Sequence, residues 1–81
     1  MELREVFAQN LRHFRQQRSL SQESLAAEAG IDRTYISALE RGVYSATVDM
    51  IEKLAAVLSV APHVLLLPKH EGTPPKKRTA Q

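Results

Sequence analysis

The 81-residue sequence has no cysteine and no tryptophan, and it contains only two Phe and two Tyr. The lack of cysteine excludes disulfides and thiolate metal sites, and it fits a reducing cytosol. With so few aromatic residues, a core must be built from Leu, Ile, Val and Ala. No apolar run approaches the roughly 20 residues of a membrane-spanning helix, and the charged N-terminus lacks a signal-peptide apolar segment. We therefore predict a cytoplasmic protein without membrane contact.

Positive charge is concentrated at the C-terminal end of the sequence. Residues 1–67 carry seven Lys or Arg and eight Asp or Glu, a net charge of −1, whereas residues 68–81 carry four and one, a net charge of +3. The second segment is rich in Pro, Gly, Lys and Thr and has no apolar periodicity, so it cannot build a core. The composition predicts one folded domain over residues 1–67 and a basic disordered tail over residues 68–81.

The sequence offers little to an enzyme. The three histidines, His13, His63 and His70, have no metal-ligand spacing, and no histidine lies near a plausible nucleophile–acid pair. There is also no glycine-rich phosphate loop. We expect no catalytic activity, no metal, no cofactor and no small-molecule ligand.

Apolar residues recur at helical spacing through residues 3–67 and predict an all-α fold of five helices. The first helix is expected over about residues 3–17 and the fourth over residues 47–58, with Thr47 as its cap and Val48 on its inner face. The fifth begins at Pro62, since proline fits the first helical position, and Pro68 stops it. Val64, Leu65, Leu66 and Leu67 make this last helix apolar all round, so it is either buried within the subunit or part of a dimer interface. We favour the interface.

The stretch "SQESLAAEAGIDRTYISALERG", residues 21–42, predicts two short helices separated by almost nothing. Ser21 and Asp32 are good N-caps for the second and third helices, and Gly30 supplies the left-handed residue that ends the second. Gly42 closes the third. A glycine-containing link as short as Gly30-Ile31-Asp32 produces a near-perpendicular helix pair, the helix-turn-helix.

This region resembles the Cro/repressor-like (Xre-type) helix-turn-helix family of DNA-binding proteins. The matching stretches are "LSQESLAAEAGI" for the supporting helix, "DRTYISALERG" for the recognition helix and "TVDMIEKLAAVLSV" for the next helix. The likeness covers roughly residues 6–67 and implies a lambda-repressor-like fold. The sequence departs from the family at Ser59, where glycine is common, and Ala61 is a poor cap for the last helix.

The resemblance implies a role for each exposed side chain of this region. The family places the start of the third helix in the DNA major groove, which implies base contacts from Arg33, Thr34, Ser37 and Ala38. It implies DNA backbone contacts from Gln22, Tyr35, Tyr44 and Ser45. It also implies a structural ion pair between Arg15 and Glu40, which neutralises an acid that would otherwise repel phosphates.

Together these features predict a sequence-specific, nucleoid-associated transcriptional regulator that binds a palindromic operator in double-stranded DNA as a homodimer. In size the chain resembles small phage repressors and restriction–modification controller proteins. Two alternatives stay open: an antitoxin-like protein that also binds a toxin, and a helix-turn-helix module that binds only proteins.

Overall fold

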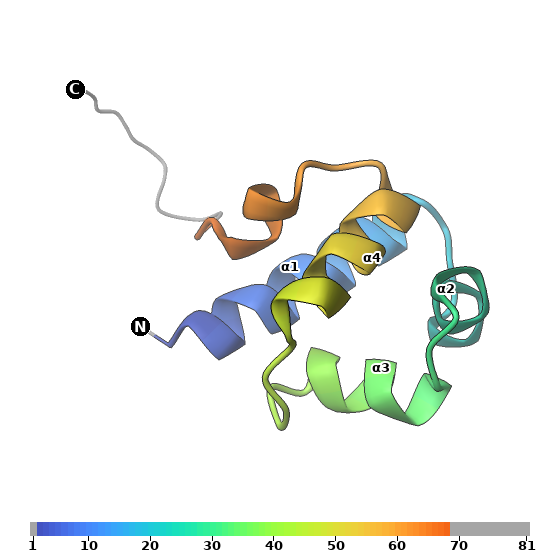
Figure 1. The fold of residues 1–81 in the computed structure, drawn as a ribbon, viewed down its shortest axis with the longest axis horizontal. Coiled ribbons are helices and arrows are strands. Elements are labelled where there is room, and N and C mark those ends of the chain that lie inside the picture. The colour runs from blue at the N-terminus through green and yellow to red at the C-terminus, as the bar shows by residue number, and fades with distance from the viewer. Residues whose placement is uncertain (1, 69–81) are drawn as a thin grey trace.

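The computed structural model describes residues 2–68, and within this range the chain forms four α-helices, one short 3₁₀ helix and no strand (Figure 1). The helices are α1 (Leu3–Gln17), α2 (Gln22–Ala29), α3 (Arg33–Glu40), α4 (Val48–Leu58) and the 3₁₀ helix η1 (Pro62–Leu66). The predicted all-helical class is confirmed. None of these helices is long and apolar enough to cross a membrane. Most of the predicted tail, residues 69–81, lies outside the described range.

The predicted fifth α-helix is wrong, because residues 62–66 form a 3₁₀ helix instead. Ala61 stands at its N-cap position and makes no side-chain cap hydrogen bond. At the other end, Pro68 restricts the residue before it to extended backbone, and Leu67 has φ −91° and ψ 129°. An uncapped start and a forced stop leave room for little more than one turn, a length that 3₁₀ geometry suits.

Side chains cap the N-termini of α2, α3 and α4, as the sequence predicts. The cap oxygens accept backbone N–H bonds two or three residues ahead, at 2.9 Å for Ser21, 2.7 Å for Asp32 and 3.0 Å for Thr47. Gly30 ends α2 with φ 70° and ψ 36°, in the left-handed region that glycine adopts freely. Local chemistry therefore sets where these helices begin and where α2 ends.

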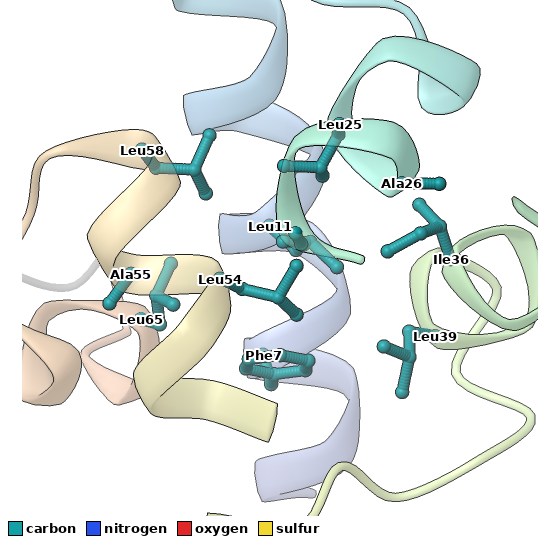
Figure 2. Close-up of a cluster of buried hydrophobic side chains, with 11 residues drawn as sticks. Phe7, Leu11, Leu25, Ala26, Ile36, Leu39, Leu54, Ala55, Leu58 and Leu65 are labelled. Atoms are coloured by element: carbon teal, nitrogen blue, oxygen red, sulfur yellow. The ribbon is translucent and has the colours of Figure 1, made fainter. Parts of the chain in front are cut away.

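The core lies where the four α-helices meet (Figure 2). α1 packs against α3 and η1, and α2 packs against α3 and α4. The buried apolar cluster consists of Phe7, Leu11, Leu25, Ala26, Ala29, Ile36, Leu39, Leu54, Ala55, Leu58 and Leu65. Val48, expected on the inner face of α4, is instead 81% exposed. It is the first residue of α4, and the inner face begins further along the helix.

A buried asparagine ties η1 to α1. Asn10 is 1% exposed, and its Nδ2 donates to the backbone carbonyls of Leu65 at 2.9 Å and Leu67 at 2.8 Å. Because a buried amide without partners is unfavourable, these two bonds fix the chain after α4 against α1. No sequence pattern predicted this contact, since the partners are 55 and 57 residues away.

Candidate nucleic-acid interface

The turn from α2 to α3 brings the two helices together at a sharp crossing. Ile31 N–H donates to the Ala26 carbonyl at 2.9 Å, which closes the end of α2 around the left-handed Gly30. The side chain of Ile31 packs against the core cluster. In Figure 1, α2 is seen nearly end-on while α3 runs across the view, so the pair forms the predicted helix-turn-helix.

α3 is divided into a buried side and an exposed side. Ile36 and Leu39 are fully buried in the core. Arg33 and Thr34, in the first turn, are exposed, and Ser37 is half-buried. Arg33 has no ion-pair partner among residues 2–68, so its five N–H donors are available to a ligand. The first turn of α3 therefore presents a guanidinium and a hydroxyl outward.

Ala38 does not belong with these exposed residues. Ala38 is only 4% exposed. Gly42, with φ 73°, turns the chain back after α3, and the N–H of Val43 donates to the Ala38 carbonyl at 3.0 Å. The expectation that Ala38 faces a base is therefore corrected, because its methyl group has almost no surface to offer.

Two tyrosines lie side by side next to the exposed face of α3. Tyr35 of α3 is half-buried and Tyr44 of the α3–α4 loop is 54% exposed. Their ring centroids are 5.9 Å apart and the rings are inclined by 38°. Ser45, which follows Tyr44 and is also expected at the DNA backbone, is exposed as well. The sequence predicted a role for each residue separately, whereas the ring contact depends on the loop conformation.

Behind this face, Glu40 joins α1, α2 and α3. Arg15 of α1 donates from Nε to Glu40 Oε2 at 2.6 Å and from Nη2 to Oε1 at 3.0 Å. Arg15 Nη1 also donates to the Leu20 carbonyl at 2.7 Å, just before the cap of α2. Gln22, expected only to face DNA phosphate, donates from Nε2 to Glu40 Oε1 at 3.1 Å. The resemblance implied the pair of Arg15 and Glu40, but it did not indicate Gln22 as the third member.

The four residues that the sequence predicted at a dimer interface differ in burial. Leu65 is fully buried in the subunit core and next to Ala55 (Figure 2), so its assignment to a dimer interface is wrong. Val64 and Leu66 are half-buried, and Leu67 is 50% exposed. The physical reason is that Asn10 holds η1 against α1, which turns one residue of the four into the core.

An apolar surface continues from Leu66 across neighbouring elements. Leu66 lines a shallow groove of about 280 Å³ together with Leu3 of α1 and Val48 of α4. Leu3 is 55% exposed and Val48 is 81% exposed. We call Leu3, Val48 and Leu66 of this groove, together with the exposed Leu67 next in sequence, the apolar face. Large exposed apolar residues gathered in one place are typical of a surface that is covered by a partner.

Comparison with known proteins gives the family of this fold. The sequence profile of the helix-turn-helix family matches residues 11–65, more than half of the chain. The chain is 50% identical over 70 residues to a hypothetical transcription factor of Neisseria meningitidis serogroup B, covering 86% of this chain and 66% of that protein. It is 45% identical over 65 residues to control protein C.BamHI of Bacillus amyloliquefaciens, covering 79% and 80%.

A solved relative is similar in structure as well. The crystal structure of SinR, the master regulator for biofilm formation, in complex with DNA superposes with a TM-score of 0.73 at 32% sequence identity. The match covers 75% of this chain and 98% of the SinR chain. The shared region includes the helix-turn-helix and the helix after it.

Proposed function

Because the chain belongs to the helix-turn-helix family, we propose that it is a sequence-specific DNA-binding transcriptional regulator that acts as a homodimer. The observation that carries this proposal is the first turn of α3, where Arg33 and Thr34 are exposed on a helix whose other side is core. The similarity to a control protein and to a regulator solved with DNA supports it. The expected partner is double-stranded DNA.

In this proposal the start of α3 lies in the major groove. Arg33 donates through two N–H groups to O6 and N7 of a guanine, the commonest specific contact between a side chain and a base. The methyl group of Thr34 meets a thymine, and Ser37 lies one turn further along. These side chains read sequence because they reach base edges, which differ from one base pair to the next.

The residues around α3 hold the protein on the sugar–phosphate backbone. Gln22 stands at the start of α2, where free backbone N–H groups already favour an anion. Tyr35, Tyr44 and Ser45 contribute hydroxyl donors beside the groove. Contacts of this kind position the protein without reading sequence. They explain why several polar, uncharged side chains accompany one arginine.

The apolar face provides the dimer interface of the proposal. η1 packs on α1 and α4, and in Figure 1 it lies across these helices from α3. In this arrangement association through Leu66 and Leu67 leaves both copies of α3 uncovered, and Ser45, which lines the same groove as Leu66, lies beside the interface. Two recognition helices in successive major grooves lie about 34 Å apart, so the operator is roughly palindromic.

Selection from a random duplex DNA pool tests the function. We expect enrichment of a palindrome with half-site centres about 10–10.5 base pairs apart. Sedimentation of the free protein at tens of micromolar tests the dimer. Leu67→Asp should give a folded monomer with weak DNA binding, whereas Ala56→Asp, which adds the same charge at an exposed site of α4, should remain dimeric.

The two parts of the proposal fail separately. If the unmodified protein enriches no sequence, it is not a sequence-specific regulator. If it enriches an asymmetric site and sediments as a monomer both free and on DNA, the dimer is wrong while DNA recognition stands.

A further inference from the structure

The carboxylate of Glu40 occupies a position that is unfavourable for an acid. Glu40 is the last residue of α3, where the helix dipole places partial negative charge, and its side chain is only 4% exposed. A buried carboxylate persists only when it is paired and hydrogen-bonded. Arg15 already meets that need, because it donates to both carboxylate oxygens.

The third hydrogen bond to this carboxylate, from Gln22, is therefore not needed to stabilise Glu40. Its main effect is to hold the Gln22 side chain in one orientation. A glutamine amide has two N–H donors at one end and an acceptor oxygen at the other. A carboxylate only accepts hydrogen bonds, so Glu40 selects the nitrogen end of the amide. The bond at 3.1 Å uses one N–H of Gln22 and leaves the second N–H to point elsewhere.

The place of Gln22 suggests what the second N–H is for. Gln22 is the first residue of α2 and is half-buried. The backbone N–H groups of its helical turn lack partners within the helix, except where Ser21 accepts the bond from Ser24. An amide held beside such a helix start is well placed to join backbone N–H groups around a single anion.

We propose that Glu40 is a positioning residue for DNA binding, which holds the Gln22 amide so that its second N–H donates to a DNA phosphate. The inference rests on the proposed function. Ordering a flexible side chain at an interface weakens binding. Here the side chain is ordered when the domain folds, through the same ion pair that joins α1 to α3. The carboxylate of Glu40 thus both stabilises the folded domain and raises its affinity for DNA.

A four-protein cycle tests this role: the unmodified chain, Gln22→Met, Glu40→Gln and the double variant. Methionine keeps the length of Gln22 and removes its donors. Glutamine at position 40 keeps the shape of Glu40 but can present either amide end, so Gln22 is no longer held one way. The ligand is the best-bound duplex recovered from the random pool. Dissociation constants are measured at one salt concentration and at a temperature where circular dichroism shows all four proteins folded.

We expect Gln22→Met to weaken binding about tenfold, the scale of a hydrogen bond to a charged group. Glu40→Gln should weaken binding by several-fold on the same scale. The double variant should bind no more weakly than Gln22→Met alone, because the effect of Glu40 passes through Gln22. If Glu40→Gln weakens binding equally with and without Gln22, Glu40 acts through helix arrangement and the inference is wrong.

One control variant and one alternative measurement complete the test. Leu58→Ala destabilises the core without touching the network, so its folded form should bind DNA as the unmodified chain does. Should Glu40→Gln fail to fold, NMR of the free unmodified protein decides. We expect a single Gln22 side-chain rotamer with distinct amide hydrogens, and rotamer averaging would overturn the proposal. If the unmodified protein binds no duplex at all, the proposed function fails first.

Discussion

All four α-helices are followed by a left-handed residue, and the turns after α2 and α4 share a backbone geometry but differ in sequence. After α2, Gly30 has φ 70° and ψ 36°, and the next N–H, of Ile31, donates to the Ala26 carbonyl at 2.9 Å. After α4, Ser59 has φ 60° and ψ 41°, and the N–H of Val60 donates to the Ala55 carbonyl at 3.0 Å. Both turns have the hydrogen-bond pattern of a Schellman motif.

The segments after the two turns differ in structure. Asp32 stands two residues after Gly30 and caps an α-helix of eight residues. Ala61 stands two residues after Ser59, makes no cap hydrogen bond and begins a 3₁₀ helix of five residues. The turn therefore sets the direction of the chain, whereas the cap and the residues after it decide which helix forms next. The structure after the first turn is set by local capping, whereas the structure after the second turn is set by tertiary contacts.

Removing the tertiary anchor of the second turn should have the largest effect. In Asn10→Ala the carbonyls of Leu65 and Leu67 lose their side-chain donor. Leaving the buried Leu65 carbonyl unpaired and the part-buried Leu67 carbonyl without its donor should lower the free energy of unfolding by about 2–3 kcal/mol. Urea denaturation measures the loss, and Gln9→Ala, at the exposed neighbouring position of α1, should change it by less than about 0.5 kcal/mol. Equal losses in the two variants would show that Asn10 does not anchor η1.

Changing the glycine of the first turn should have an intermediate effect. An added Cβ at Gly30 meets no atom within 4 Å, so Gly30→Ala tests backbone strain alone. The left-handed conformation should lower the free energy of unfolding by about 1–2 kcal/mol. Gly30→Asn should lose less, since asparagine tolerates this region better than alanine. The contrary result, an unchanged melting temperature in Gly30→Ala, would mean that the turn relaxes without strain.

The matching change in the second turn should have the opposite sign and the smallest size. Ser59→Gly relieves a left-handed residue that carries a Cβ, and it should raise the free energy of unfolding by about 0.5–1 kcal/mol. Ala56→Gly, three residues earlier and exposed within α4, should lower it by about 1 kcal/mol. Thermal unfolding of both variants is sufficient. Destabilisation by Ser59→Gly would show that the serine makes a compensating contribution.

The same contrast explains which features could be predicted from the sequence. The α2–α3 region was predicted in detail because a cap or a left-handed glycine acts within a few residues. The last segment was not, since the burial of Leu65 depends on Asn10, far away in the chain. The spacing of apolar residues within a helix also does not show which of its other residues the rest of the chain will bury. That is why Ala38 was placed on the exposed face although it is almost fully buried.

The candidate site divides in a similar way. Arg33 and Thr34 are exposed as expected, because their place in the first turn of α3 results from the cap at Asp32. The contact between Tyr35 and Tyr44 depends on the conformation of the α3–α4 loop. No local pattern in the sequence indicated it.

The most direct test of the central claim, that the first turn of α3 reads DNA sequence, compares sequence-selection profiles of Arg33→Ala and Gln22→Ala at one salt concentration. We predict that Arg33→Ala weakens binding by about 1–3 kcal/mol and relaxes the preference at one base pair of each half-site. Gln22→Ala should weaken binding to all sequences alike and leave the preferred sequence unchanged. If Arg33→Ala keeps the same base preferences at every position, Arg33 does not read a base and the assignment of the reading surface is contradicted.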